Sequence, residues 1–221
     1  FNGSSSSGDY VNIPYNTALN VTTDITLTAW IKKAADADYG GIISKTDGST
    51  LWDYDFFICD SGCTAGNDYL GFYSNATTPD EIFSNRTLTG TDWHHVAITR
   101  SGSTVTFYID GQAAGGGTMS GSFASNSLDL KIGTDGTGSG VYQFNGKIDE
   151  PKLYNEALTA DQIKLDYNKS STQILGAMGN NSTAGAVNAA SQEYCIPGDS
   201  TTCTGPVARW DFDAQSSNNQ T

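Results

Sequence analysis

Residues 93–111 read Trp-His-His-Val-Ala-Ile-Thr-Arg-Ser-Gly-Ser-Thr-Val-Thr-Phe-Tyr-Ile-Asp-Gly. Apolar and polar residues alternate in two short runs, at 94–99 and 105–109, and this period predicts two β-strands. Asp110-Gly111 follows the second run and suits the tight turn of a β-hairpin. Further runs of the same kind lie at 10–13, 25–31, 41–44, 54–58, 69–73, 128–132 and 146–153. Strands this numerous predict an all-β, two-sheet antiparallel sandwich.

Residues 159–168 carry a helical pattern instead. Thr159 can cap the start of a helix, with Gln162 at the third helical position to return the cap. Leu158, Ile163 and Tyr167 then share one face. We expect one short helix that packs on an edge of the sandwich.

The apolar alternation ends near residue 169, which sets the limit of the sandwich domain at 1–169. Residues 170–205 are mostly Ser, Thr, Asn, Ala and Gly, a composition typical of a linker or long loop. Alternation returns at 207–213, as Val-Ala-Arg-Trp-Asp-Phe-Asp. The terminal segment 206–221 is therefore predicted to supply one more strand.

Acidic residues outnumber basic ones, with 24 Asp+Glu against 11 Lys+Arg and a formal net charge of -13. Such a surface repels phosphate backbones and anionic lipid headgroups, so nucleic acid is excluded as a partner. The chain also has no apolar run long enough to insert into a membrane. Calcium or a cationic partner fits this charge better.

The four cysteines fall in two close pairs, Cys59 with Cys63 and Cys195 with Cys203. Each pair can close a small Gly-containing loop, which predicts two disulfides in an oxidising compartment. Zinc is the alternative. It is disfavoured because a structural zinc site needs four converging ligands and neither pair has a neighbouring His.

Asn-x-Ser/Thr sequons are frequent, although a chain this rich in Asn, Ser and Thr also makes them by chance. They occur at Asn2, Asn20, Asn75, Asn85, Asn168, Asn180, Asn181 and Asn219. They agree with a secreted glycoprotein. The chain shows no signal peptide and no initiator Met, and we therefore expect a mature fragment of a longer precursor.

A series of short motifs runs in order along the chain. They are Phe1-Asn2-Gly3, Asp9-Tyr10-Val11, Leu27-Thr28-Ala29-Trp30-Ile31, Ile42-Ile43-Ser44-Lys45, Trp93-His94-His95-Val96-Ala97, Tyr108-Ile109-Asp110-Gly111, Ile132-Gly133, Phe144-Asn145-Gly146-Lys147-Ile148-Asp149-Glu150 and Leu153-Tyr154-Asn155-Glu156-Ala157-Leu158. From residue 1 to about 168 this series resembles the laminin G-like (LamG-like) domains of the concanavalin A-like lectin/glucanase superfamily. The resemblance implies a jelly-roll sandwich with a binding function. Without the resemblance, residue type alone predicts Trp30 and Trp93 as core aromatics of facing sheets.

The order of the motifs departs from this family in one respect. LamG-like domains of this subtype usually begin with a strand resembling Trp-x-Phe-Asp-Glu, whereas here Trp210-Asp211-Phe212-Asp213 stands near the end of the chain. Three explanations stay open. The chain is one period of a tandem array, or it is circularly permuted and its last strand folds back, or that strand completes the sheet of a neighbouring molecule. The strand residues concerned are Val207, Arg209, Trp210 and Phe212.

The resemblance also implies a structural calcium ion between the first and last strands of the domain. Asp149 matches the last-strand aspartate, and Asp213 with Asn218 and Asn219 matches the first-strand contribution. Oxygen ligands of this kind suit Ca²⁺. The alternative is that Asp149 only caps the end of a strand.

Catalysis is not expected. Relatives that hydrolyse glycans use a Glu-x-Asp-x-x-Glu arrangement, which does not occur in this sequence. Asp53 and Asp55 share a strand face if alternation is strict, and such a pair can act as acid and base, but solvated surface is their commoner fate. His94 and His95 have no nucleophile motif beside them, and we expect one to point inward and one outward.

Two functions remain. The first is a non-enzymatic extracellular subunit of a microbial surface fibre or adhesin, which binds copies of itself head to tail through residues 207–213. The alternative is a calcium-dependent carbohydrate-binding module for surface glycans. Its candidate sugar-stacking residues are Trp52, Tyr54, Tyr69, Tyr73 and Tyr142, although aromatics are equally good core formers.

Overall fold

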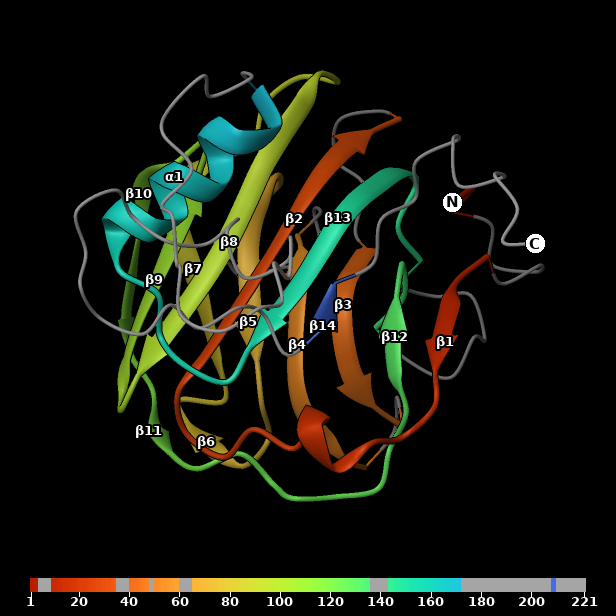
Figure 1. Cartoon of the computed structure of the whole chain (residues 1–221), viewed down its shortest axis with the longest axis vertical. Helices are drawn as coiled ribbons and strands as arrows, with labels where there is room; N and C mark the ends of the chain where they lie inside the picture. The colour runs from red at the N-terminus through yellow and green to blue at the C-terminus, as the bar shows by residue number, and fades with distance from the viewer. Residues whose placement is uncertain are drawn as a thin grey trace, which may run out of the picture.

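A computed structural model describes residues 1–3, 9–34, 40–47, 50–59, 65–135, 143–171 and 208–209. They form two six-stranded antiparallel sheets that pack face to face, with one short α-helix outside them (Figure 1). The predicted all-β sandwich with one helix is confirmed. Among the residues described, no helix has the length and apolar character needed to cross a bilayer.

Each sheet is named here after one of its strands. The β4 sheet has the order β1 (Val11–Ile13), β12 (Leu130–Ile132), β3 (Gly40–Thr46), β4 (Trp52–Ile58), β5 (Tyr69–Tyr73) and β7 (Glu81–Thr87). The β8 sheet has the order β10 (Gln112–Thr118), β9 (Thr104–Ile109), β8 (Trp93–Ser101), β2 (Ile25–Lys33), β13 (Gly146–Tyr154) and β14 (Ala208–Arg209). A two-stranded ladder of β6 (Thr77–Thr78) and β11 (Ser120–Gly121), a 3-10 turn η1 (Thr17–Leu19) and the helix α1 (Ala160–Ser171) complete the fold.

The core lies between the two sheets. One apolar row crosses all six strands of the β4 sheet in register, as Val11, Ile132, Ile43, Phe56, Phe72 and Ile82. The β8 sheet contributes Leu153, Leu27, Ile98 and Phe107 in the same way. Each large apolar side chain removed from water stabilises the fold by about 1.5–3 kcal/mol, so burial between the two sheets contributes strongly to stability.

The predicted strands are confirmed wherever the sequence alternates. The hairpin after residues 105–109 is confirmed too, because Asp110 and Gly111 have φ values of 52° and 71°, as a type I′ turn requires. Strands β7 and β10 were not predicted. Their sequences, Glu-Ile-Phe-Ser-Asn-Arg-Thr and Gln-Ala-Ala-Gly-Gly-Gly-Thr, lack a regular apolar period and form strands because their neighbours pair with them.

The predicted capping box of α1 is present. The Thr159 amide donates to Gln162 Oε1 at 2.8 Å, and the Gln162 amide donates to Thr159 Oγ1 at 3.3 Å. The expected packing on an edge of the sandwich is wrong. The helix lies across the outer surface of the β8 sheet (Figure 1). There the Tyr167 ring stacks on Trp30, with centroids 5.7 Å apart.

Neither tryptophan predicted as a core aromatic lies in the core, and the two are on one sheet instead of facing sheets. Trp30 is half-buried beneath α1, on the outer face of the β8 sheet. Trp93 is 40% exposed at the start of β8. It pairs directly with Lys32 on β2, whose side chain is also partly exposed, so this end of the ladder points to solvent. Trp93 therefore provides an exposed tryptophan on the β8 sheet, opposite the β4 sheet.

The displaced terminal strand is described only at Ala208 and Arg209, and residues 207 and 210–221 lie outside the described residues. Arg209 pairs with Lys152 and Ala208 with Leu153, antiparallel to β13 of the same chain. This pairing corresponds to the explanation in which the strand folds back. The predicted linker lies outside the described residues from position 172 to 205.

Candidate functional site

A second row of side chains crosses the β4 sheet beside the apolar one. Residues that pair directly across strands project to the same face, and the next residue along each strand projects to the other. Because the apolar row faces the core, this second row faces away from it. Its members are Asn12, Lys131, Ser44, Asp55, Tyr73 and Glu81. We call this surface the outer row.

Trp52 and Tyr73 form an aromatic pair at one end of the outer row. Their ring centroids are 5.3 Å apart and the planes meet at 77°, an edge-to-face contact. Both side chains are half-buried, so each still offers part of its ring to solvent. An aromatic ring of this kind, apolar in body and fixed in place, is suited to stacking on a flat, partly apolar ligand.

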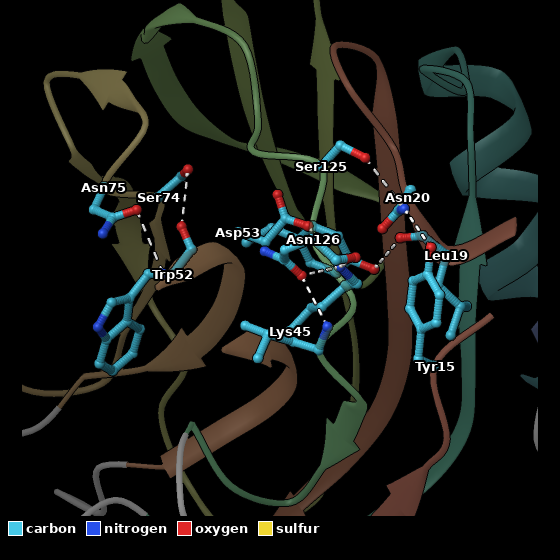
Figure 2. Close-up of polar contacts among 12 residues, drawn as sticks. Tyr15, Leu19, Asn20, Lys45, Trp52, Asp53, Ser74, Asn75, Ser125 and Asn126 are labelled. Carbon is cyan, nitrogen blue, oxygen red and sulfur yellow. Dashed lines mark hydrogen bonds and ion pairs between the residues drawn. The ribbon is translucent and has the colours of Figure 1, made fainter. Parts of the chain in front are cut away.

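The backbone of Trp52 is held from the neighbouring turn (Figure 2). The Trp52 amide donates to Asn75 Oδ1 at 3.4 Å, and the Trp52 carbonyl accepts from Ser74 Oγ at 3.3 Å. Asn75 Nδ2 in turn donates to the Thr50 carbonyl at 2.8 Å. The indole ring points away from these polar contacts (Figure 2). The ring is therefore positioned before any ligand arrives, and less freedom is lost on binding.

Asp55 lies in the middle of the outer row and is only 1% exposed. Its cover comes partly from the backbone of Thr134 and Asp135, which lies so close to Gly41 that a Cβ there would meet the Asp135 nitrogen at 2.3 Å. Ser44 Oγ donates to the Thr134 carbonyl on the same side. Asp55 Oδ1 is buried without a hydrogen-bond partner among the described residues.

The outer row is rich in carboxyl groups whose pKa values are raised. Burial raises the pKa of Asp55 well above its usual range, and the carboxylates of Asp135 and Glu81 raise it further. Burial also raises the pKa of Asp135 to about 7, against the weaker opposing influence of its own backbone amide and Lys131. The pKa of Glu81 is raised by burial and by Asp80. These shifts mean that the row holds more carboxyl groups than it has cations to balance them.

The remaining sugar-stacking candidates differ in their positions. Tyr54 was predicted wrongly, because it is fully buried and its hydroxyl donates to the Leu19 carbonyl at 3.0 Å. Tyr69 is half-buried on β5, on the same strand face as Tyr73. The Phe57 ring lies over Gly71 between them. Tyr142 lies outside the described residues.

Asp53 and Asp55 do not form the shared-face pair that strict alternation predicts. The ladder of β3 and β4 shifts register between Lys45 and Thr46, which makes Asp53 an extra residue in a bulge. Its carboxylate accepts from Lys45 Nζ at 2.9 Å, and both side chains are fully buried. Lys45 also donates to the Asn126 carbonyl at 3.1 Å (Figure 2). Asp53 is thus neutralised within the fold, whereas Asp55 belongs to the outer row.

The two histidines lie on opposite faces of β8, as predicted, but the buried one is on the outer face beneath α1 and does not hydrogen-bond inside the sandwich. His95 is buried, with Nε2 3.2 Å from Asp166 Oδ2 beneath α1. His94 is partly exposed, with Nδ1 2.8 Å from Asp110 Oδ2. The Asp110 hydrogen bond raises the pKa of His94 in spite of partial burial. Both are explained by contacts that stabilise the fold.

The predicted calcium site is represented by Asp149 alone. Asp149 is half-buried, and its Oδ1 accepts from the Glu150 amide at 2.8 Å. Asp213, Asn218 and Asn219 lie outside the described residues, and within the described ranges no three His, Cys, Asp or Glu side chains group as metal ligands. One carboxylate that already accepts a backbone hydrogen bond is not a sufficient ligand set, so calcium stays a prediction.

The covalent predictions fall partly on described residues. Cys59 is disulfide-bonded, while Cys63, Cys195 and Cys203 lie outside the described residues, so both pairings stay predictions. Of the sequon asparagines, Asn2, Asn75 and Asn85 are exposed and Asn20 and Asn168 are half-buried; Asn180, Asn181 and Asn219 are not described. Sugar attachment at any of them stays a prediction.

Comparison with known proteins places the chain in a family. The family model Laminin_G_3, which describes the Concanavalin A-like lectin/glucanases superfamily, matches residues 4–164. The chain belongs to this superfamily. It is also 27% identical over 170 residues to the Adhesion G-protein coupled receptor V1 of Danio rerio, a match that covers 73% of this chain and 3% of the receptor.

Solved structures share the superfamily fold with this chain. Domain 4 of AbnA, a GH43 extracellular arabinanase from Geobacillus stearothermophilus determined with arabinotriose, aligns with a TM-score of 0.55 and 19% identity, over 72% of this chain and 71% of that one. A protein from Bacteroides ovatus, assigned as a carbohydrate binding protein, aligns with a TM-score of 0.57 and 22% identity. The match covers 72% of this chain and 44% of that one. At these identities the likeness establishes the fold and nothing finer.

The sequence located part of this site. Trp52 and Tyr73 were named from residue type, and the structure brings them together. Glu81, Lys131 and Asp135 were missed, and Asp55 was considered only as a partner of Asp53. A signal for Asp55 was available on β4, because two carboxylates, Asp53 and Asp55, interrupt a strand that is otherwise aromatic and apolar.

Proposed function

We propose that this chain is an extracellular, non-catalytic module that binds carbohydrate on the outward face of the β4 sheet. The Trp52–Tyr73 pair carries the proposal, because it combines two half-buried rings with a row of hydrogen-bonding side chains beside them. Sugar rings present apolar C–H faces to aromatic rings and hydroxyls to carboxyl and amide groups. The outer row offers both.

The relatives support this proposal in general terms. AbnA domain 4 was determined in complex with arabinotriose, and the Bacteroides ovatus protein is described as carbohydrate binding. The receptor relative is an adhesion protein by name, which favours an extracellular setting. Binding without catalysis is favoured because Asp53 pairs with Lys45 inside the fold, which separates the two carboxylates of β4 that could otherwise work as acid and base.

Head-to-tail assembly through residues 207–213 is the second hypothesis. Its motive is the displaced first strand of the sequence. The pairing of Ala208 and Arg209 with β13 of the same chain favours closure within one molecule instead. Carbohydrate binding is therefore the leading proposal, and assembly is tested separately below.

A glycan array followed by titration calorimetry tests the proposal, with calcium present and absent. We expect one or more neutral or basic glycans to bind, and Trp52→Ala to weaken that binding about tenfold through lost ring contact. Trp93→Ala is the matched control, because it removes an exposed tryptophan from the other sheet. Unchanged affinity in Trp52→Ala, or no glycan bound by the folded protein, would reject this site.

A further inference from the structure

The aromatic pair lies in the most anionic part of the outer row. Tyr73 pairs directly with Asp55 on one side and Glu81 on the other. After burial, the groups that raise the pKa of the Tyr73 hydroxyl are three carboxylates, those of Asp80, Glu81 and Asp55. No cation is among them. The ring therefore sits in a negative field that other charges near it do not cancel.

The cation of the outer row is too far away to compensate. Lys131 lies on β12, and Ser44 and Asp55 separate it from Tyr73 in the row. Three strand spacings put it about 14 Å from Tyr73. Its ammonium group also donates to the Thr46 carbonyl at 2.7 Å. The pair and its carboxylates thus form a local anionic surface.

Two buried polar groups beside the row add an independent observation. Asp55 Oδ1 has no hydrogen-bond partner among the described residues, and neither amide atom of Gln143 has one, although the residues are only 1% and 4% exposed. Gln143 forms backbone bridges to Gly41 and Thr134, next to Asp135. A buried carboxyl without a compensating charge keeps its proton, as the raised pKa of Asp55 indicates, because ionising it there is costly. A cation bound above the row would offset that cost.

The kind of cation follows from the surfaces that meet it. Aromatic rings attract organic ammonium groups through their negative faces, and nearby carboxylates add charge-assisted hydrogen bonds. Calcium instead takes six to eight oxygen ligands. A rim of Trp52, Tyr73 and Glu81 suits an ammonium group better than a metal ion.

We propose, resting on the carbohydrate-binding function above, that the glycan ligand carries free amines. An ammonium group of an amino sugar lies against the Tyr73 ring between Trp52 and Glu81, with Asp80 at the rim and Asp55 beneath. Uronic and sialic acids are repelled by the same carboxylates. The overall net charge of -13 adds long-range attraction for a basic polysaccharide.

Three oligosaccharides of one linkage and length test this proposal by titration calorimetry: β-1,4-linked glucosamine, N-acetylglucosamine and glucose. They differ only in an ammonium, an acetamide or a hydroxyl group at the same carbon. We expect the glucosamine oligomer to bind at least about tenfold more tightly than the other two. That preference should fall several-fold between about 50 and about 500 mM salt, where charges are screened.

Variants localise the effect. Glu81→Gln should weaken glucosamine binding about fivefold and leave glucose binding unchanged, because only the ammonium contact is lost. Asp80→Asn, on an exposed residue, serves if Glu81→Gln fails to fold. Asp161→Asn is the matched control, since it removes one exposed carboxylate on α1, across the molecule from the β4 sheet.

The outcomes separate the two proposals. Equal affinity for the three oligomers, with loss in Trp52→Ala, overturns the amine preference and leaves carbohydrate binding in place. Tight glucosamine binding that Trp52→Ala and Glu81→Gln do not alter is nonspecific attraction to an acidic chain, and it also overturns the amine site. If none of the oligomers and no glycan on the array binds, both proposals fail.

Discussion

Replacing Asp166 with Asn removes a charge from the contact between α1 and the β8 sheet. Asp166 is 3% exposed and accepts from Lys152 Nζ at 2.8 Å and from Thr28 Oγ1 at 3.1 Å, and its Oδ2 lies 3.2 Å from His95 Nε2. The asparagine amide keeps the shape of the side chain. It also turns one of the two acceptor atoms into a donor that faces other donors.

The size of the effect follows from these contacts. Removing one member of a buried ion pair costs about 3–5 kcal/mol when the other charge is left uncompensated. Here Lys152 still has Glu150 at 3.0 Å, whose side chain is 26% exposed. The amide oxygen also still accepts one hydrogen bond. We therefore expect Asp166→Asn to lower the free energy of unfolding by about 2–4 kcal/mol.

The sign of the pH dependence is a second part of the same prediction. Burial alone would raise the pKa of Asp166, but hydrogen bonding to His95 and the charge of Lys152 outweigh it and hold the pKa well below the 3.8 of an ordinary aspartate. The unfolded chain then binds this proton more readily than the native one. Its contribution is present above pH 3.8 and fades as the pH falls below that value.

Urea unfolding followed by tryptophan fluorescence measures both effects. Asp161→Asn, on the same helix but exposed, should stay within about 0.5 kcal/mol of the parent. The double change Asp166→Leu with Lys152→Met removes both charges and should cost less than Asp166→Asn. A loss below about 1 kcal/mol in Asp166→Asn, or a loss that does not shrink in acid, would refute the reasoning.

Three further outcomes are expected. In urea unfolding, Asp135→Asn should stabilise the protein by at least about 1 kcal/mol at pH 8 but not at pH 4. The reason is that a carboxyl whose pKa rises from 3.8 to about 7 on folding destabilises the fold progressively across that pH range. A difference in unfolding free energy that is the same at both pH values contradicts this. Gly71→Ala should lower Tm at a cost of about 1–3 kcal/mol, since its Cβ would lie 2.2 Å from the Phe57 ring, and Phe57→Leu in the same chain should recover part of the loss. If residues 206–221 join molecules head to tail, their deletion should convert polymers to monomers in light scattering at high concentration; a parent that is already monomeric rejects assembly.

Alternation was the reliable signal for the fold. The runs at 25–31 and 105–109 became β2 and β9 because their alternate apolar residues face the core, and a one-residue slip would turn all of them away from it. β10 gave no such signal. It is a Gly-rich strand whose position is set by pairing with β9 and by contact with β7. Neither interaction can be recognised from the sequence of β10 alone.

The candidate site was harder to predict because a single bulge changes which residues share a face. Strict alternation puts Trp52 and Tyr54 together and Asp53 with Asp55. Tyr54 stays on the core face with Phe56, and the extra residue at Asp53 turns Trp52 to the outer face beside Tyr73. The burial of Asp55 depends on the chain near Asp135, eighty positions away in sequence, and no local pattern encodes that approach.

The outer surfaces of the two sheets treat buried charge differently, and this contrast favours the β4 sheet as the binding surface. On the β8 sheet, α1 covers the face, and the carboxylate of Asp166 meets His95, Lys152 and Thr28. On the β4 sheet, Asp55 keeps an oxygen without a partner, and its neighbours Asp135 and Glu81 add charge of the same sign. The fold gives Asp166 a full set of partners and leaves an oxygen of Asp55 without one. Such a loss of stability is typical of sites that also serve a function. Because this unpartnered carboxyl lies beside two half-exposed rings, a cationic ligand that favours its ionised form would explain both features at once.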